Sequence, residues 1–202
     1  MSQMSHVLAE DPAVDLAIAR AMTDELEEYI IQDDLYRTVF SPTPRGDEKL
    51  AMTGGDLLTR LYRLQGERER LTPGQQQELD AVQSQADAVI YSLKSRFNER
   101  LLRELGARLD SLRWFLDECS EDSQRCRANY PYEIRNRQRI EEILKRIGGD
   151  LPDDVKSRLR DTDRRLEQSS AAHPFIWDTR LEPIFPADQY WYLYRLPRQA
   201  AG

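Results

Sequence analysis

Carboxylate side chains crowd the first predicted helix, where their spacing could serve metal-dependent chemistry. Glu25 and Glu28 are three residues apart, which places both on one face of a helix. A helical magnesium site would need a second carboxylate pair on the next helix, and residues 54–70 offer none. Neither His6 nor His173 follows a glutamate at the spacing of di-iron bundles. We therefore predict a solvated acidic face with no metal and no cofactor, and keep a metal-dependent hydrolase on this helix as an alternative.

The chain has two cysteines, Cys119 and Cys126, with six residues between them. No histidine lies near them in the sequence, so a zinc site would lack two of its usual ligands. Nucleophilic catalysis would need a base, and His173 directly before Pro174 is expected to cap a helix end or to pack. We expect two free thiols. A disulfide between them is the competing possibility, and it requires Cα atoms within about 7 Å.

Basic residues concentrate between residues 125 and 146, beside two tyrosines. This combination could bind phosphate groups and stack bases. Arg135, Arg139 and Arg146 share one helix face with Glu142, turned away from the apolar stripe, which is typical of a solvent face. These three arginines are the candidate anion-binding residues, and binding of nucleic acid or a phosphorylated ligand is a further alternative function. The sequence contains no phosphate-binding loop, dinucleotide fingerprint or hydrolase elbow.

The end of the chain is rich in aromatic residues and prolines. Residues 173–202 hold seven of the seventeen aromatic residues, which is too apolar for a solvated tail. We expect an irregular aromatic strap packed on the helices, with Phe175, Trp177 and Phe185 facing them. The candidate interaction residues, open to a partner or a second subunit, are Tyr190, Trp191 and Tyr194.

Two shorter helices are predicted before residue 72. The apolar stripe of residues 12–32 recurs at steps of three and four, with Asp11 as N-cap and a proline in the first turn. Residues 35–40 either continue this helix or form a separate turn, and the two prolines and the glycine of residues 41–46 then interrupt it. Thr53 caps the second helix. No strand pattern is strong.

The clearest helix start in the sequence is Thr72, with Pro73 in the first turn and Gln75 placed for a capping box. Apolar positions then follow at steps of three or four as far as Leu116 without a proline. This spacing predicts one helix to about Glu118, about 70 Å long, straight or bent near its internal glycine. Its stripe rotates around the helix, which indicates changing neighbours rather than a dimeric zipper.

Residues 119–129 are predicted to be a polar loop, followed by a helix opened by Tyr130 and Pro131 and another opened by Leu151 and Pro152. We therefore expect an all-α bundle of about five helices around one long central helix, with an irregular aromatic C-terminal strap. It should form a single domain over residues 1–202, with a flexible N-terminus at residues 1–11 and the strap at residues 173–202.

The formal net charge is −7, and it is concentrated at the start of the chain. Residues 1–50 carry 11 acids and 4 bases, whereas residues 51–202 carry 25 of each. Such an acidic end discourages contact with nucleic acid or an anionic membrane, and it can attract a basic partner. No apolar run is long enough for a bilayer, and the first residues lack the pattern of a secretory signal. We therefore expect a cytoplasmic protein.

The sequence favours a non-enzymatic interaction or structural module that acts through helix surfaces or self-association. The expected partner is a protein or a second copy of the chain, with no membrane partner and no nucleic-acid partner under this reading.

Overall fold

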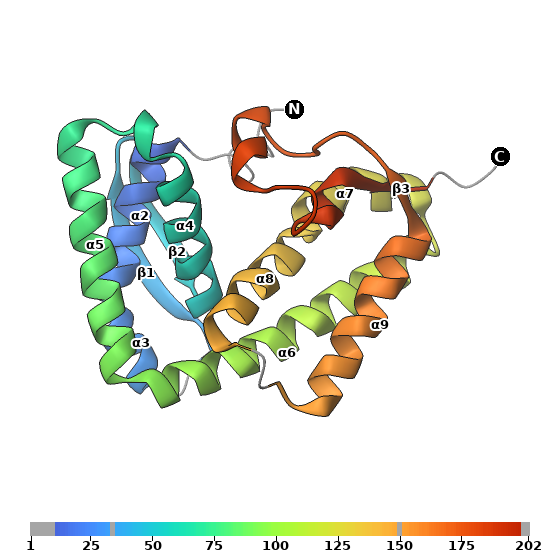
Figure 1. The fold of residues 1–202 in the computed structure, drawn as a ribbon, viewed down its shortest axis with the longest axis horizontal. Coiled ribbons are helices and arrows are strands. Elements are labelled where there is room, and N and C mark those ends of the chain that lie inside the picture. Colours follow the sequence, from blue (N-terminus) through green and yellow to red (C-terminus); the bar gives the residue numbers. More distant parts are fainter. Residues whose placement is uncertain (1–10, 33–34, 149–150, 199–202) are drawn as a thin grey trace. The chain divides into compact units, whose positions relative to one another are not determined.

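The computed structural model describes residues 11–32, 35–148 and 151–198 of the chain. Most of these residues are α-helical, and the strands form two small two-stranded sheets (Figure 1). The all-α prediction is confirmed at this level. By their contacts the residues divide into two compact units, an N-terminal unit of residues 10–104 and a C-terminal unit that includes residues 105–202.

The N-terminal unit is built from helices and one β-hairpin, of which one face is open to solvent. Its elements are α2 (Pro12–Asp24), α3 (Leu26–Ile31), β1 (Arg37–Thr43), β2 (Gly46–Met52), α4 (Gly54–Gly66), the 3₁₀ turn η1 (Arg68–Arg70), α5 (Pro73–Ser92) and the first part of α6 (Lys94–Cys119). Helix α2 packs against β1, α4 and α5. Its predicted apolar stripe is buried, and the predicted cap Asp11 accepts a hydrogen bond from the backbone nitrogen of Ala13 at 2.9 Å.

The hairpin was not predicted, and the expectation of a helix or an isolated turn over residues 35–40 is wrong. Strands β1 and β2 pair antiparallel with Thr43 opposite Gly46, so that a two-residue turn connects them. Gly46 has a φ of 122°, which a side chain would strain. Along β1, Val39 and Ser41 are buried whereas Phe40 is exposed. A buried serine and an exposed phenylalanine invert the usual alternation, so the strand gave no clear signal.

The predicted long helix is interrupted. Helix α5 ends at Ser92 and α6 begins at Lys94, with Leu93 at φ −114° and ψ 26° between them. The Ser92 hydroxyl donates to the carbonyl oxygens of Ala88 and Val89, both at 3.0 Å, and such back-bonding bends helices. The break therefore lies at Leu93 rather than near the internal glycine, and Figure 1 shows the chain changing direction between α5 and α6. The predicted capping box at Thr72 is present.

Glu104 caps the start of α4 from the neighbouring helix. Its carboxylate accepts from the Thr53 hydroxyl at 2.7 Å and from the Gly55 backbone nitrogen at 2.8 Å, and it is buried. A carboxylate at a helix N-terminus interacts favourably with the helix dipole. Gly54 permits this close packing, because a Cβ there would lie 2.8 Å from a methyl carbon of Leu101.

The C-terminal unit contains the remainder of α6 and the elements that follow it. These are α7 (Ser123–Glu133), α8 (Arg135–Ile147), α9 (Asp153–Ser169), β3 (Ser170–Ala172), η2 (Thr179–Ile184), η3 (Trp191–Tyr194) and β4 (Arg195–Pro197). The polar loop predicted over residues 119–129 is wrong, because Asp122 caps α7 by accepting from the Arg125 backbone nitrogen at 2.9 Å. Pro131 lies inside α7 rather than opening a new helix.

The aromatic strap packs against α7 and α8. The Tyr130 hydroxyl of α7 donates to the backbone oxygen of Tyr192 at 2.9 Å, and the Trp177 indole donates to that of Pro131 at 2.8 Å. Edge-to-face contacts run from Trp177 to Phe185 and on to Tyr190, with ring centroids 5.5 and 4.9 Å apart. The strap thus contributes aromatic side chains to the buried core of this unit, and β4 at the end of the strap pairs with β3.

Candidate functional site

The acids of the first helices are occupied by neighbouring side chains. Glu25 accepts from Arg37 of β1 at 2.6 Å, and Glu28 accepts from Gln32 at 2.6 Å. Within residues 11–32, 35–148 and 151–198, no three histidine, cysteine, aspartate or glutamate side chains are grouped to hold a metal ion. Glu25 and Glu28 therefore do not converge on a third carboxylate there.

The three candidate anion-binding arginines lie along α8 and differ in their exposure to solvent. The Arg135 guanidinium lies 5.0 Å from the ring centroid of Tyr132, Arg139 is half-buried, and Arg146 is exposed in the last turn. Glu142, predicted on the same solvent face, is buried. Arg137 points inward and pairs with Asp163 and Glu141. Part of the basic charge of this helix thus stabilises the unit internally.

The three candidate interaction residues of the strap differ in exposure. Tyr190 is fully buried, and its hydroxyl donates to Glu142 Oε1 at 2.6 Å, so it offers no surface to a partner in this structure. Trp191 is half-buried with its ring against Tyr192. Tyr194 is half-buried and donates its hydroxyl hydrogen to the Phe185 backbone oxygen at 2.9 Å.

The cysteines form a disulfide, so the prediction of two free thiols is wrong. Cys119 is the last residue of α6 and Cys126 lies in the second turn of α7, and their Cα atoms are 4.8 Å apart. The unpredicted start of α7 is the physical reason, because it folds the connection back on α6 and brings the two residues within bonding range.

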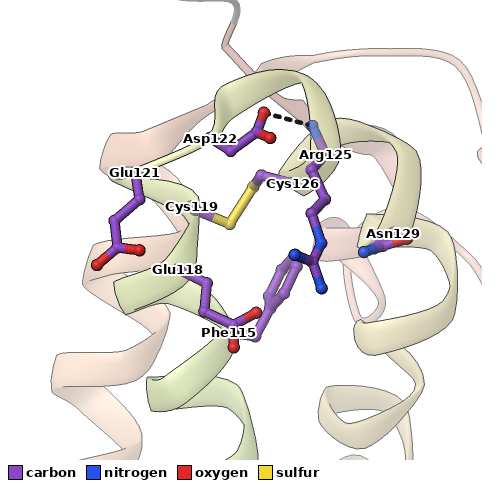
Figure 2. Close-up of a pocket in the computed structure, with 8 residues that line it drawn as sticks. All are labelled: Phe115, Glu118, Cys119, Glu121, Asp122, Arg125, Cys126 and Asn129. Carbon is purple, nitrogen blue, oxygen red and sulfur yellow. Dashed lines mark hydrogen bonds between the residues drawn. A yellow bond between two sulfur atoms is a disulfide. The ribbon is translucent and has the colours of Figure 1, made fainter.

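A small hollow of about 140 Å³ opens beside this disulfide (Figure 2). Both cysteines line it, with Phe115 as an apolar wall. Its polar lining is mixed in charge and consists of Glu118, Glu121, Asp122, Arg125 and Asn129. Cys126 is buried whereas Cys119 is partly exposed, so the two residues differ in access to solvent.

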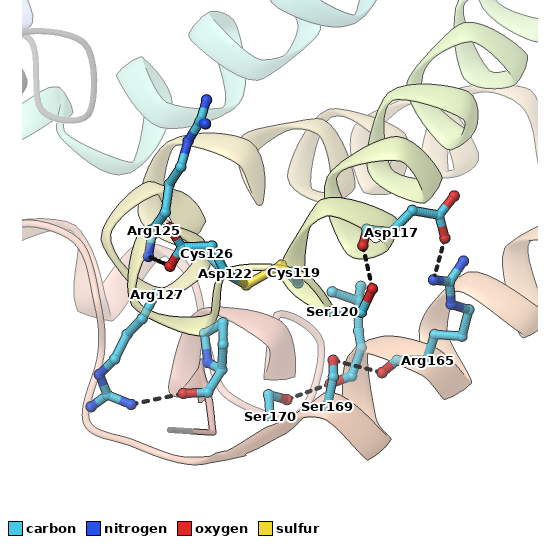
Figure 3. The surroundings of a disulfide bond; sticks show 12 residues. Asp117, Cys119, Ser120, Asp122, Arg125, Cys126, Arg127, Arg165, Ser169 and Ser170 are labelled. Carbon is cyan, nitrogen blue, oxygen red and sulfur yellow. Dashed lines mark hydrogen bonds and ion pairs between the residues drawn. A yellow bond between two sulfur atoms is a disulfide. The ribbon is translucent and has the colours of Figure 1, made fainter. Parts of the chain in front are cut away.

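A larger groove of about 400 Å³ lies between α7 and the strap. Five apolar residues line it: Ala128, Pro131, Phe175, Ile176 and Leu196. Its polar lining comprises Gln124, Arg127 and His173, with no carboxylate. In Figure 3 the Arg127 side chain extends from α7 away from the disulfide. Helix α7 thus contributes lining residues to both the disulfide hollow and the groove.

Hydrogen bonds on both sides hold this groove open. Arg127 donates to the backbone oxygen of Pro197 at 2.8 Å, and Trp177 donates to that of Pro131. Along the strap, the backbone nitrogens of His173 and Ile176 donate to the oxygens of Tyr194 and Leu193 respectively. These bonds fix the walls of the groove to each other, and fixed walls lower the ordering cost of binding.

Sequence reasoning did not find the groove. Its residues come from three separate stretches, around Ala128, Ile176 and Leu196, and they share no local pattern. The prolines and aromatic residues of the strap predicted that it packs on the helices. Nothing in the sequence indicated which of its apolar side chains would line a groove beside α7.

No protein-family model, curated protein or solved structure matches the chain. Among the described residues, no helix combines the length and apolar character needed to cross a membrane.

Proposed function

We propose that the protein is a non-enzymatic interaction module that binds an apolar segment of a partner protein in the groove between α7 and the strap. The observation that carries this proposal is the groove itself, an apolar hollow of about 400 Å³ on the surface of the C-terminal unit. Open, preformed apolar hollows with a few polar groups are typical of binding sites.

The rim of the groove selects the charge of the partner. Arg127 and His173 line the groove, and no acidic residue does. Arg127 donates a hydrogen bond to the backbone oxygen of Pro197, and the next residue, Arg198, is exposed and adds a second positive charge near the rim. A segment with acidic residues beside its apolar centre complements this rim, whereas a basic segment is repelled. The partner is therefore an apolar stretch of protein with acidic flanks.

The test uses methyl NMR on Ala128, Ile176 and Leu196 of the full chain. Two synthetic peptides serve as probes, each with a leucine-rich centre, one flanked by glutamates and the other by lysines. We expect the glutamate-flanked peptide to shift all three methyl signals in a saturable way, and the lysine-flanked peptide to bind at least about tenfold more weakly. Shifts that spread over other methyl groups and spare these three would refute the proposal.

A matched pair of variants locates the binding. Ala128→Glu places a carboxylate inside the groove and should abolish binding of the glutamate-flanked peptide. Ala88→Glu makes the same change at an exposed helical alanine of α5 and should leave binding unchanged. Equal loss in both variants would assign the effect to net charge rather than to the groove.

We also propose that the protein is cytoplasmic. Disulfides in that compartment are usually transient and redox-sensing, whereas those of secreted proteins are permanent. Fractionation of the producing cells, with the redox state of Cys119 and Cys126 trapped by alkylation, tests the location and the state of the pair together.

A further inference from the structure

The Cys119–Cys126 disulfide joins opposite ends of two helices. Cys119 closes α6 at its C-terminus, where the helix dipole is negative, and Cys126 follows the N-terminus of α7, where it is positive. The helix dipoles therefore favour a thiolate at Cys126 over one at Cys119, although the burial of Cys126 works against its charge. Solvent access has the complementary asymmetry, because Cys119 is the more exposed of the two.

We propose that this disulfide is a redox-active site that exchanges with a dithiol and thereby controls the groove. A thiolate of the dithiol attacks Sγ of Cys119, the Sγ–Sγ bond breaks, and Cys126 leaves as a thiolate. The second thiol of the reagent loses its proton and attacks the mixed disulfide, which releases Cys119 as a thiolate. The reagent leaves as a disulfide, and two electrons pass to the protein. The thiolates of Cys119 and Cys126 take up the two protons that the reagent's thiols have lost.

The hollow provides the point of attack. It lies beside both sulfur atoms, and its volume of about 140 Å³ can admit the end of a thiol side chain (Figure 2). Its charged lining consists of three carboxylates and one guanidinium, which repels an anionic thiol. A neutral thiol such as 2-mercaptoethanol should therefore react faster than glutathione. Added salt should reduce the difference between the two reaction rates, because it screens the repulsion.

Reduction affects the groove through α7, and this step rests on the proposed function. The C-terminal half of α7 is held by Tyr130 and Pro131, whose contacts with the strap do not involve the disulfide. In the first two turns, the disulfide at Cys126 adds a covalent tie to α6 beside the three-residue connection 120–122, and the Arg127 side chain adds a hydrogen bond to the Pro197 backbone oxygen. Without the disulfide, the groove wall at Gln124 gains freedom, and a ligand must order it again on binding.

The chemical arm of the test needs no groove ligand. The full chain, without denaturant, is treated briefly with 2-mercaptoethanol and quenched with N-ethylmaleimide, and its peptides are mapped by mass spectrometry. We expect the mixed disulfide on Cys119 and the maleimide on Cys126. The reverse pattern, or a disulfide that dithiothreitol reduces only after unfolding, would overturn the proposal.

The structural arm compares oxidised and dithiothreitol-reduced protein, with the Cys119→Ser/Cys126→Ser double variant as a control that reductant should not affect. Amide hydrogen exchange should quicken in the first turns of α7 on reduction and stay unchanged around Tyr130. Affinity for the glutamate-flanked peptide should fall at least about fivefold, the lower end of allosteric coupling.

The failures of the two proposals are distinguishable. If oxidised protein does not bind the peptide, the proposed function fails. The redox site is then still tested by the selectivity of thiol exchange at Cys119 and by hydrogen exchange in α7. If oxidised protein binds and the reduced form binds equally well, control of the groove is refuted and the proposed function stands.

Discussion

Tyr190 donates a hydrogen bond of 2.6 Å to Oε1 of Glu142, and both side chains are buried between the strap and α8. Burial raises the pKa of Glu142, although the hydrogen bond from Tyr190 and the charge of Lys145 oppose the shift. The folded protein binds the proton of the Glu142 carboxyl group more tightly than the unfolded chain does, so protonation of Glu142 stabilises the fold. This stabilisation is fully present below the ordinary pKa of 4.5. It is lost as the pH rises through the raised folded value.

Tyr190→Phe should lower the free energy of unfolding by about 1–3 kcal/mol at neutral pH, because Glu142 keeps its burial and loses a donor. The pKa of Glu142 should rise further in the variant, which carboxyl NMR can measure. Tyr91→Phe is the control, since Tyr91 is 84% exposed, and it should change neither quantity. An unchanged Glu142 titration in Tyr190→Phe would contradict the role assigned to this hydroxyl.

Asp15 is the buried partner of two arginines in the N-terminal unit. Burial alone would raise its pKa, but Arg63, at 2.7 Å, and Arg60 outweigh burial, so the pKa is lowered. We expect Asp15→Asn to cost about 3–5 kcal/mol near neutral pH, because it removes the buried carboxylate charge that both guanidinium groups contact. Asp80→Asn breaks an exposed pair with Arg68 and should have little effect.

The cost of Asp15→Asn should depend on pH in a defined direction. A carboxyl group with a depressed folded pKa stabilises the protein above its unfolded value, and this contribution is lost as the pH falls through the folded value. The difference between wild type and variant should therefore shrink below pH 3.8. Urea unfolding at several pH values measures it, and a difference that grows on acidification would be contrary to this account.

Gly54→Ala should destabilise the N-terminal unit by about 1–3 kcal/mol, because the new methyl group would lie 2.8 Å from Leu101 and 2.9 Å from Phe97. Gly74→Ala is the matched control in the first turn of α5, where a Cβ meets nothing within 4 Å. It should be neutral or slightly stabilising. Thermal unfolding of the two variants side by side makes the comparison, and equal melting temperatures would rule out the close approach.

Local signals in the sequence predicted local structure. Asp11, Thr53 and Thr72 cap helices as expected, because a short polar side chain before an apolar stripe acts on the next few backbone nitrogens. The break at Leu93 was missed because Ser92 acts through its hydroxyl and leaves the apolar spacing intact. Helix α7 was missed because its polar composition masks the cap at Asp122.

The candidate site could not be predicted in the same way, because it depends on contacts between distant segments. The disulfide follows from the fold of α7 on α6, and the groove follows from where the strap leaves Ile176 and Leu196 beside Ala128. The burial of Tyr190 likewise required its partner Glu142, 48 positions away, which the sequence placed on a solvent face.

Loss of the disulfide should destabilise the C-terminal unit, because the unfolded chain regains the conformational entropy that the closed loop removes. The bond joins residues seven positions apart, and the chain-entropy relation gives about 2.5 kcal/mol for so short a loop. Urea unfolding of oxidised protein and of the Cys119→Ser/Cys126→Ser variant measures this difference, followed by tryptophan fluorescence, because all three tryptophans lie in this unit. Dithiothreitol should bring wild type close to the variant and leave the variant unchanged. If the reduced protein is as stable as the oxidised one, the disulfide adds nothing to the fold, and its position beside the hollow would have to be explained by exchange alone.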